Sequence, residues 1–354
     1  MIEGLERALV ANGWLRLRDL GYSELECAIG EALGGERSAK LVAQETIKSR
    51  VFRLRFETKN QIRSFVVKRM NSSHARRNEL VIRRWLPDLG LDGVAPDLLG
   101  VAAGRAGRWV WHVYEDLGPW ELDARNPDPE SVAAAVRVIA SLHQRFSAHP
   151  LLAECRLYGE SPGLCFSMSN VRDAVHGLER LRPPGVQLSP EQAQVRDRLL
   201  DRLLRLRDEE PMRTRALAEW GGPETFLHGD LWTSNTFVEP GVDGCRVRLI
   251  DWDHAGVGPA SYDLSTFLLR FAPEHRPWIL TLYREALKDG PWSLPGPCEL
   301  NRLFEIAECS RYANRVIWPA IALLRDRAEW GFAELASVES WFEALQPVLP
   351  EEPA

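Results

Sequence analysis

The chain has 354 residues, of which 45% are hydrophobic and 27% are charged, and its net charge is −6. This length exceeds that of an ordinary single domain and predicts two lobes. No apolar run approaches the roughly 18 residues that a membrane span requires, and the N-terminal stretch carries acids where a signal peptide would be apolar. The negative charge disfavours a general nucleic-acid binder. We therefore expect neither membrane nor nucleic-acid partners.

Two further counts concern location and ligand charge. The six cysteines are scattered without a C-x-x-C pair, which predicts reduced thiols and a cytoplasmic protein. Residues 1–100 contain 17 basic and 13 acidic residues, a net charge of +4, so the remainder carries −10. A basic first part facing an acidic second part would suit an anionic ligand beside a metal or a cationic partner. Solvated surfaces without a functional meaning are the alternative.

The first third of the chain has the pattern of an antiparallel sheet with one inserted helix. Short helices are expected within residues 1–34, where Leu5, Leu9, Leu15 and Leu20 follow loosely helical spacing. Strands are expected at 40–47, 49–58, 62–70, 96–104 and 108–118. Between the third and fourth of these strands, Ser72 or Ser73 would cap a helix that Pro87 terminates. The expected fold class is α+β.

The rest of the chain is mainly helical by pattern. Asp128 would cap one helix, with Pro129 at its first position, and Ser189 with Gln192 has the spacing of a capping box. Strand patterns return only at 224–230, 235–239 and 245–252, and the turn residues 240–244 join the last two of these strands. After Asp263 the pattern is helical again, interrupted at 290–299.

Two stretches carry the chemistry: FLHGDLWTSN at 226–235 and RVRLIDWDHAG at 246–256. An antiparallel hairpin across 240–244 would bring Asn235 beside Asp251, and the short loop before Asn235 would return Asp230 to the same end. Two carboxylates and an amide oxygen suit Mg²⁺ shared with phosphate oxygens. In phosphoryl transfer one acid orients the attacking hydroxyl while an acid and an amide hold the metal. Turn and cap chemistry is the alternative, but an unpaired carboxylate in an apolar strand is costly.

With these motifs the sequence resembles the aminoglycoside phosphotransferase and choline kinase family. HGD stands where protein kinases have His-Arg-Asp, IDW stands for Asp-Phe-Gly, and the match continues through Gly258, Pro259 and Asp263. The resemblance implies a protein-kinase-like fold with an antiparallel-sheet N-lobe at 1–117 and a mainly helical C-lobe at 118–354. It implies that Asp230 is catalytic, that Asn235 and Asp251 hold the metal, and that the aspartate before Leu264 supports the catalytic loop.

The family pattern also requires nucleotide-binding residues in the first lobe. A strand lysine should bind the phosphates and a helical glutamate should orient it, which Lys68 and Glu79 satisfy. The segment Glu115, Asp116 and Leu117 matches the backbone that binds adenine. One feature departs from the pattern: the loop QETIKSR at 44–50 has no glycine to admit phosphates. Lys48, Ser49 and Arg50 would then contact phosphates through side chains, and the choice between ATP and GTP stays open.

Several neighbouring residues are assigned structural roles. His143 is expected to pack beneath the catalytic loop, and His228 to support that loop. Asp253 and His254 are expected on a surface loop, with a position at the border of the site as the alternative. Trp232 is placed near the acceptor, whose pocket in this family is built largely from the C-terminal helices, with Glu305, Glu308, Tyr312 and Trp318 as candidates.

The predicted activity is Mg²⁺-dependent transfer of the γ-phosphoryl group of ATP, or GTP, to a hydroxyl of a small molecule such as an aminoglycoside or another antibiotic. Alternatives are a kinase-like module that binds nucleotide without turnover, or a kinase of a sugar or amino alcohol. A metallophosphoesterase would need histidines in other contexts, and a protein kinase would need an Ala-Pro-Glu segment. The acidic second part favours a cationic acceptor, and the oligomeric state stays open.

Overall fold

The computed structural model describes residues 2–11, 21–36, 39–59, 61–104, 107, 109–182, 186–242 and 244–350. The chain forms two compact units, one made of residues 1–122 with 234–255 and the other of 123–233 with 256–354. The predicted lobe division at 117/118 stays a prediction. Two leucines of the predicted N-terminal helices, Leu15 and Leu20, lie outside the described residues, and so does Asp243 of the predicted turn. Within the described ranges no helix has the length and apolar character needed to cross a membrane.

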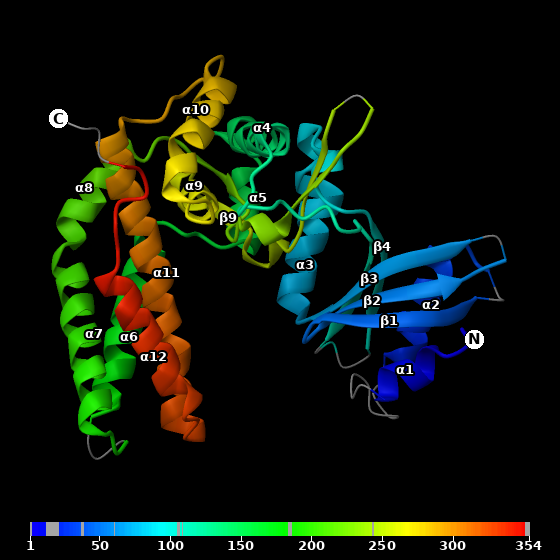
Figure 1. The fold of residues 1–354 in the computed structure, drawn as a ribbon, viewed down its shortest axis with the longest axis horizontal. Helices are drawn as coiled ribbons and strands as arrows, with labels where there is room; N and C mark the ends of the chain where they lie inside the picture. Colours follow the sequence, from blue (N-terminus) through cyan, green and yellow to red (C-terminus); the bar gives the residue numbers. More distant parts are fainter. Residues whose placement is uncertain are drawn as a thin grey trace. The chain divides into compact units, whose positions relative to one another are not determined.

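The first unit is built on a five-stranded antiparallel sheet with the strand order β1-β2-β3-β5-β4 (Figure 1). The expected strands are confirmed. A later segment of the chain adds a separate two-stranded β-hairpin to this unit, in which β7 and β8 pair antiparallel. The elements of this unit are α1 (Leu5–Ala11), α2 (Tyr22–Ala32), β1 (Lys40–Lys48), β2 (Val51–Glu57), β3 (Ile62–Met70), α3 (Ser72–Leu80), β4 (Leu98–Ala103), β5 (Val110–Glu115), β7 (Thr236–Glu239) and β8 (Arg246–Leu249).

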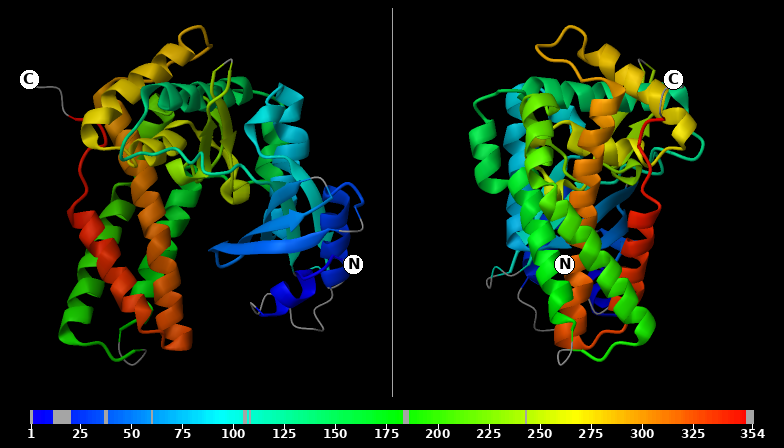
Figure 2. Two further views of the ribbon diagram at one scale, coloured as in Figure 1. Left: turned by 45° about the vertical axis from the view of Figure 1, so that its right-hand side comes forward. Right: turned by 90° about the vertical axis from the view of Figure 1, so that its left-hand side faces the viewer.

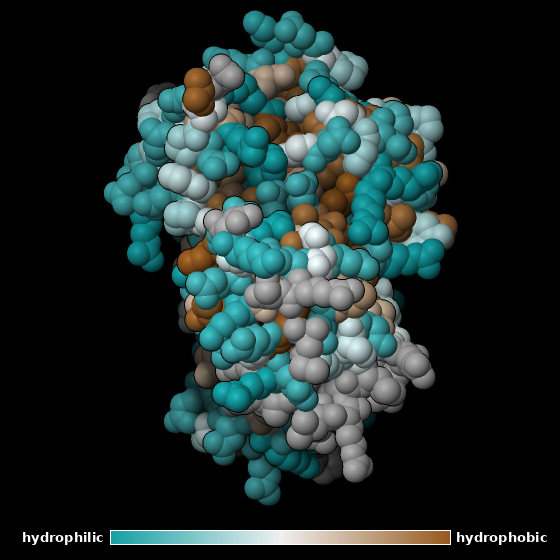
Figure 3. Space-filling view, turned by 90° about the vertical axis from the view of Figure 1, so that its right-hand side faces the viewer, coloured by the Kyte–Doolittle hydropathy of each residue, from teal (hydrophilic) through white to brown (hydrophobic). Residues whose placement is uncertain are grey.

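The sheet has two chemically different faces. Along β2, Phe52, Leu54 and Phe56 are buried in a core that they form with α1 and α2. The alternating residues Val51 and Arg53 face the opposite side, because successive side chains of a strand point to opposite faces. Hydrophilic residues cover most of the molecular face seen in Figure 3. The alternation read from the sequence is therefore confirmed, and it leaves one sheet face available for a ligand.

The helix after β3 begins one residue earlier than expected. Asn71, rather than Ser72 or Ser73, is the N-cap, and its Oδ1 accepts a hydrogen bond of 2.8 Å from the backbone N–H of His74. Ser73 donates its hydroxyl to the same oxygen at 2.7 Å. The α-helix ends at Leu80 and continues as a π-helical segment, Val81–Trp85, followed by a 3-10 turn at Pro87–Leu89. The expected single helix is thus three helical segments of different pitch.

The second unit is mainly helical. Its elements are α4 (Pro129–Phe146), α5 (Leu152–Tyr158), α6 (Leu164–Arg180), α7 (Pro190–Asp208), α8 (Glu210–Trp220), β6 (Glu224–Leu227), β9 (Gly256–Pro259), α9 (Ser261–Leu268), α10 (Arg276–Leu287), α11 (Pro297–Asp326) and α12 (Trp330–Glu343). The expected cap at Asp128 and the capping box at Ser189 are both formed. Figure 2 shows α6, α7, α11 and α12 side by side, and their apolar faces share one core. The strand β6 leads directly into the HGD loop and pairs antiparallel with β9.

Candidate nucleotide pocket and catalytic loop

The open face of the sheet in the first unit forms the wall of a pocket of about 360 Å³. Cross-strand register places Val51 opposite Lys68, and Val66 opposite both Arg53 and Tyr114, so these side chains share one face. All residues that line the pocket belong to the first unit. They include Glu45, Lys48, Val51, Arg53, Val66, Lys68, Asn78, Ile82, Tyr114, Glu115, Asp116, Leu117, Ser234, Phe237, Ile250, Asp251 and Trp252.

Lys68 forms the polar end of this pocket with two carboxylates. Its Nζ lies 2.7 Å from Asp251 Oδ1 and 2.7 Å from Asp253 Oδ1. Burial lowers the pKa of Lys68, but the negative charges of Asp251 and Asp253 outweigh it, so the pKa is raised overall. The lysine is thus a fixed positive charge. The structure brings together Lys68 and Asp251, which are 183 residues apart in the sequence.

Asp253 is not a surface-loop residue, so that expectation is wrong. Its carboxylate also accepts a hydrogen bond of 2.9 Å from Asn78 Nδ2 and lies 3.3 Å from His74 Nδ1. Burial raises the pKa of Asp253, but the hydrogen bond from His74 and the positive charge of Lys68 lower it well below its ordinary value. The acid two residues beyond Asp251 is therefore an ionised part of the same cluster.

Glu79 does not contact Lys68 in this structure. Its carboxylate lies 3.4 Å from His112 Nε2 and 3.9 Å from Arg83. His112 is the cross-strand neighbour of Lys68, and its Nδ1 lies 2.8 Å from the Tyr114 hydroxyl. Burial, and then the charge of Lys68, lower the pKa of His112 to about 4. The imidazole is therefore neutral near pH 7, and its contact with Glu79 is not an ion pair.

The segment predicted to bind adenine lies along the pocket. Glu115, Asp116 and Leu117 all line it. Asp116 Oδ2 accepts hydrogen bonds from Arg53 Nε at 2.8 Å and from Ser64 Oγ at 2.6 Å, and its Oδ1 accepts one from the Gly118 backbone at 3.1 Å. Burial raises the pKa of Asp116, and these hydrogen bonds lower it further than burial raises it. Its side chain thus fixes the conformation of the segment.

The glycine-free turn contributes Lys48 to the pocket lining, whereas Ser49 is exposed and does not line it. Lys48 pairs with Val51 across the β1–β2 turn. Arg53, on the same sheet face, joins Glu45 Oε2 at 2.8 Å as well as Asp116. This rim of the pocket therefore consists of long charged side chains in place of the backbone N–H groups that glycines would expose.

The predicted hairpin is formed and carries the two proposed metal ligands. Thr236 pairs with Leu249, and the Asn235 backbone carbonyl accepts a hydrogen bond of 2.9 Å from the Ile250 N–H. Asn235 is therefore adjacent in the ladder to the residue that precedes Asp251. Asp251 has a φ of 67°, a left-handed conformation that is rare for a residue with a side chain. Such strained residues concentrate at functional sites.

The HGD loop belongs to the second unit, where the buried carboxylate of Asp263 binds its backbone. Asp263 Oδ2 accepts the backbone N–H of His228 at 2.7 Å, and its Oδ1 accepts that of Gly229 at 2.9 Å. His143 Nε2 lies 3.3 Å from Asp263, and its Nδ1 lies 2.8 Å from the Tyr283 hydroxyl. The supporting role expected for Asp263 and the packing role expected for His143 are confirmed. Gly229 has a φ of 82°, which explains a glycine between His228 and Asp230.

Asp230 and Trp232 lie at the C-terminal end of this loop. The Trp232 N–H donates to the Asp230 carbonyl at 2.9 Å, which closes a tight turn and leaves the carboxylate partly exposed. The Trp232 side chain is 39% exposed, and the guanidinium of Arg270 lies 4.0 Å from its ring centroid. Arg270 follows α9, and no sequence pattern marks it apart from its position seven residues after Asp263.

The acidic acceptor candidates are neutralised by arginines. Glu305 receives hydrogen bonds from Arg213 at 2.8 Å and from Arg302 at 2.9 Å. Glu308 is buried and pairs with Arg311 and with the Ser265 hydroxyl. Two acids on one face of α11 are thus internal ion-pair partners.

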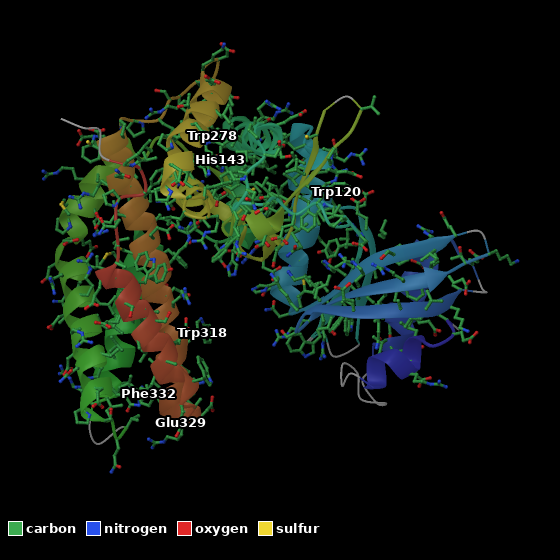
Figure 4. The ribbon with its side chains drawn as sticks, in the orientation of Figure 1. Trp120, His143, Trp278, Trp318, Glu329 and Phe332 are labelled. Atoms are coloured by element: carbon green, nitrogen blue, oxygen red, sulfur yellow. The ribbon has the colours of Figure 1, made fainter. Side chains whose placement is uncertain are left out.

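The aromatic acceptor candidates have separate positions. Tyr312 stacks on Trp341 with centroids 3.4 Å apart. Trp318 is 65% exposed on α11 and lies apart from His143 and Trp278 in Figure 4.

Comparisons with known proteins identify the fold and the family. The sequence matches the model of the phosphotransferase enzyme family over residues 45–295. No curated protein matches it. Similar solved structures include a spectinomycin phosphotransferase in complex with ADP and spectinomycin (14% identity, 88% and 91% of the two chains covered, TM-score 0.53). A Plasmodium vivax ethanolamine kinase (14%, 98% and 96%, 0.55) and a macrolide 2'-phosphotransferase from Brachybacterium faecium (17%, 94% and 100%, 0.50) are also similar. At these identities the likeness shows the fold, which is α+β and protein-kinase-like.

Proposed function

The chain belongs to the phosphotransferase enzyme family of small-molecule kinases, and on this premise we propose that it transfers the γ-phosphoryl group of ATP to a hydroxyl of a small molecule. The observation that supports this most is the contact of Lys68 with Asp251 at 2.7 Å, at the end of a pocket that Glu115, Asp116 and Leu117 also line. A lysine and a proposed metal-binding acid at one end, with the backbone of 115–117 along the pocket, are the groups that a nucleotide requires.

The proposed nucleotide site uses both ends of the pocket. The apolar side chains of Val51, Val66 and Phe237 would enclose the purine, while the backbone of 115–117 would hydrogen-bond its edge. Lys68 would bind the phosphates, with Lys48 and Ser49 as further candidates at that end, and Glu79 is the residue proposed to orient Lys68. GTP is the alternative nucleotide, since a backbone segment can present donors and acceptors to either purine.

The side chains of Asn235 and Asp251 fit a magnesium ion better than a softer metal. They supply an amide and a carboxylate oxygen, the hard donors that Mg²⁺ prefers. Over the described part of the chain there is no group of three or more His, Cys, Asp or Glu side chains arranged to hold a metal, so the remaining ligands would be phosphate oxygens and water. When bound, Mg²⁺ would neutralise charge on the phosphates.

Asp230 is the proposed base. The acceptor oxygen would form a bond to the γ-phosphorus as the bond to the β,γ-bridging oxygen breaks, with ADP leaving and the hydroxyl proton passing to the Asp230 carboxylate. The hydrogen bonds from His228 and Gly229 to Asp263 hold the backbone that carries this acid. Residues 1–117 would act as the nucleotide-binding lobe and 118–354 as the catalytic lobe.

The acceptor could come from several chemical classes. Names of structurally similar proteins include a spectinomycin, a macrolide and an ethanolamine kinase, so antibiotics, sugars and amino alcohols are all candidates, and antibiotic resistance is one role among them. A module that binds nucleotide without turnover is the second candidate, favoured by the glycine-free turn and by the placement of Glu79 against His112. We also propose a cytoplasmic location, which the free cysteines support.

Calorimetric titration of the full chain with ATP tests the nucleotide site. We expect binding that requires Mg²⁺, is lost on chelation with EDTA, and is about tenfold or more weaker in Lys68→Met, because that variant removes the only lysine of the acidic cluster. Lys59→Met, at an exposed position, is the matched control. Absence of Mg·ATP and Mg·GTP binding in the wild type would refute the proposal. Binding without any ADP formation over a broad acceptor panel would favour the module without turnover.

A further inference from the structure

An arginine beside the catalytic loop lacks an anionic partner. The Arg270 guanidinium stacks 4.0 Å from the Trp232 ring centroid. Its Nε is buried and has no hydrogen-bond partner, and no carboxylate of the described residues lies within ion-pair distance of it. Arginine side chains that are withdrawn from water are nearly always paired, so this one has unused binding capacity.

Two other largely buried arginines of the same unit have carboxylate partners, which Arg270 lacks among the described residues. Arg213 binds Glu209 at 2.7 Å and Glu305 at 2.8 Å. Arg311 binds Glu308 and stacks over the Tyr262 ring at 3.7 Å. Each of these guanidinium groups has both a carboxylate and a well-packed environment. Arg270 has the aromatic contact without the carboxylate.

The electrostatic environment of Arg270 favours an incoming anion. Burial lowers the pKa of Arg270, and the positive charge of Arg311 acts in the same direction, while Glu308, Tyr312 and Asp230 raise it by less than this. The glutamate closest to supplying compensation is already engaged with Arg311 and Ser265. An arginine remains charged in proteins, so a negatively charged ligand would relieve a desolvation cost that the charges around Arg270 compensate only in part.

The position of Arg270 assigns this anion to the acceptor. Trp232 follows Asp230, the proposed base, by two residues, and the chain turns tightly between them. We propose that the acceptor carries an oxyanion, which is a carboxylate, phosphate or sulfate group, and that the Arg270 guanidinium binds it. Trp232 would hold the guanidinium in place. This inference rests on the proposed function. It replaces the expectation of a cationic acceptor, which depended on the net negative charge of the second part of the chain; two acids counted in that charge, Glu305 and Glu308, are paired with arginines.

The geometry of the side chain suits this task. A guanidinium that stacks on an aromatic ring keeps its N–H groups in the plane of the fork, where they can form two parallel hydrogen bonds to an oxyanion. The stacking also restricts the rotamers of a long side chain before the ligand arrives. A lysine at this position would keep the charge but lose both the fork and the stacked plane.

Binding of charge-matched probes tests the inference without knowledge of the natural acceptor. The full chain, saturated with Mg²⁺ and a non-hydrolysable ATP analogue, is titrated with inorganic sulfate, glucuronate, glucose 6-phosphate, glucose and glucosamine. We expect sulfate and at least one of the two anionic sugars to bind about tenfold or more tightly than glucose and glucosamine. Glucuronate and glucose 6-phosphate distinguish a carboxylate from a phosphate site.

Variants identify the residue responsible. Arg270→Gln should abolish the preference for oxyanions, Arg270→Lys should retain part of it, and Arg172→Gln should leave it intact, because Arg172 is 74% exposed. The inference is overturned if the wild type shows no oxyanion preference, including no binding at all, or if the preference survives in Arg270→Gln. It is also overturned if Arg270→Gln weakens the ATP analogue instead, which would assign Arg270 to the nucleotide. If the analogue fails to bind the wild type, the proposed function fails and this inference fails with it.

Discussion

Two groups of polar side chains, one around Lys68 and Asp251 and the other around Asp263, differ in their access to solvent. In the first unit, Lys68 is 15% exposed and Asp251 is 29% exposed, and both line the pocket. In the second unit, Asp263 and His143 are both 0% exposed, and backbone N–H groups complete the coordination of the carboxylate. A ligand can exchange for a partner in the first group, whereas the second can only hold its loop in place. Binding chemistry and scaffolding chemistry thus use the same residue types at different degrees of burial.

The largest effect should follow from removing Asp230, the acid on the loop whose backbone Asp263 binds. We expect Asp230→Asn to lower kcat by about 10³-fold, because the carboxylate that accepts the proton is lost while the loop backbone stays bound to Asp263. Steady-state kinetics measure kcat, and calorimetry measures Mg·ATP affinity. Since the pocket lies wholly in the first unit, that affinity should stay within about twofold of the wild-type value; a variant with wild-type kcat would remove Asp230 from the proposed chemistry.

The difference in burial can be tested by matched isosteric substitutions. Asp263→Asn should lower the free energy of unfolding by about 3 kcal/mol, because the amide presents N–H donors where two backbone donors need acceptors in a site without water. Asp251→Asn should lower it by less than about 1 kcal/mol, since its partner Lys68 keeps Asp253. Urea denaturation of both variants measures these changes. Equal losses of unfolding free energy in the two variants would contradict the distinction between the buried Asp263 group and the accessible Lys68 group.

The neutral histidine beside Lys68 predicts a pH dependence of stability. The pKa of His112 is lowered to about 4 in the folded protein, against about 6.5 in an unfolded chain. Between these values the unfolded state binds more protons, so stability is full above about pH 6.5 and is lost as the pH falls, by about 3 kcal/mol at pH 4. Urea denaturation across this range should show a steeper loss in the wild type than in His112→Gln.

The control for this measurement is His176→Gln, at an exposed position, which should keep the wild-type slope. Identical slopes in the wild type and His112→Gln would show that His112 is not a neutral buried residue. The ionised carboxylates of the protein contribute at lower pH in all three proteins, so the difference between slopes isolates the histidine.

The smallest expected effect concerns the cap of α3, the helix that carries Asn78 and Glu79. Asn71→Ala should lower the free energy of unfolding by about 1 kcal/mol, because the first-turn N–H of His74 loses its acceptor. Ser72→Ala should change it by less than about half of that. Thermal or urea denaturation compares the two. A larger loss in Ser72→Ala would restore the serine as the capping residue.

Local chemistry was the part of the fold that the sequence predicted well. Alternation in β2, the capping box at Ser189 and the β7–β8 hairpin all depend on residues close together in the chain. The cap at Asn71 was missed because three consecutive residues can all accept the same N–H. The π-helical pitch of Val81–Trp85 has no sequence signal that we recognise.

Contacts over long separations were harder to predict. The pairing of Asp253 with Lys68 joins residues 185 positions apart, and most aspartates are exposed to solvent, so the sequence favoured a surface position. A similar limit applies to Glu308, whose charge counted toward an acidic acceptor site although Arg311 neutralises it. Total charge per segment cannot reveal which charges pair with each other. The same reasoning explains why Arg270 was found only in the structure.

The most direct test of the central claim is ³¹P NMR of the full chain incubated with Mg·ATP and a mixture of glucose, glucosamine, glucuronate, glucose 6-phosphate and ethanolamine. The predicted result is equal growth of the ADP resonances and of one new phosphomonoester resonance, neither of which forms with Asp230→Asn. Conversion of ATP to ADP and inorganic phosphate alone, or unchanged ATP, would contradict phosphoryl transfer to a hydroxyl.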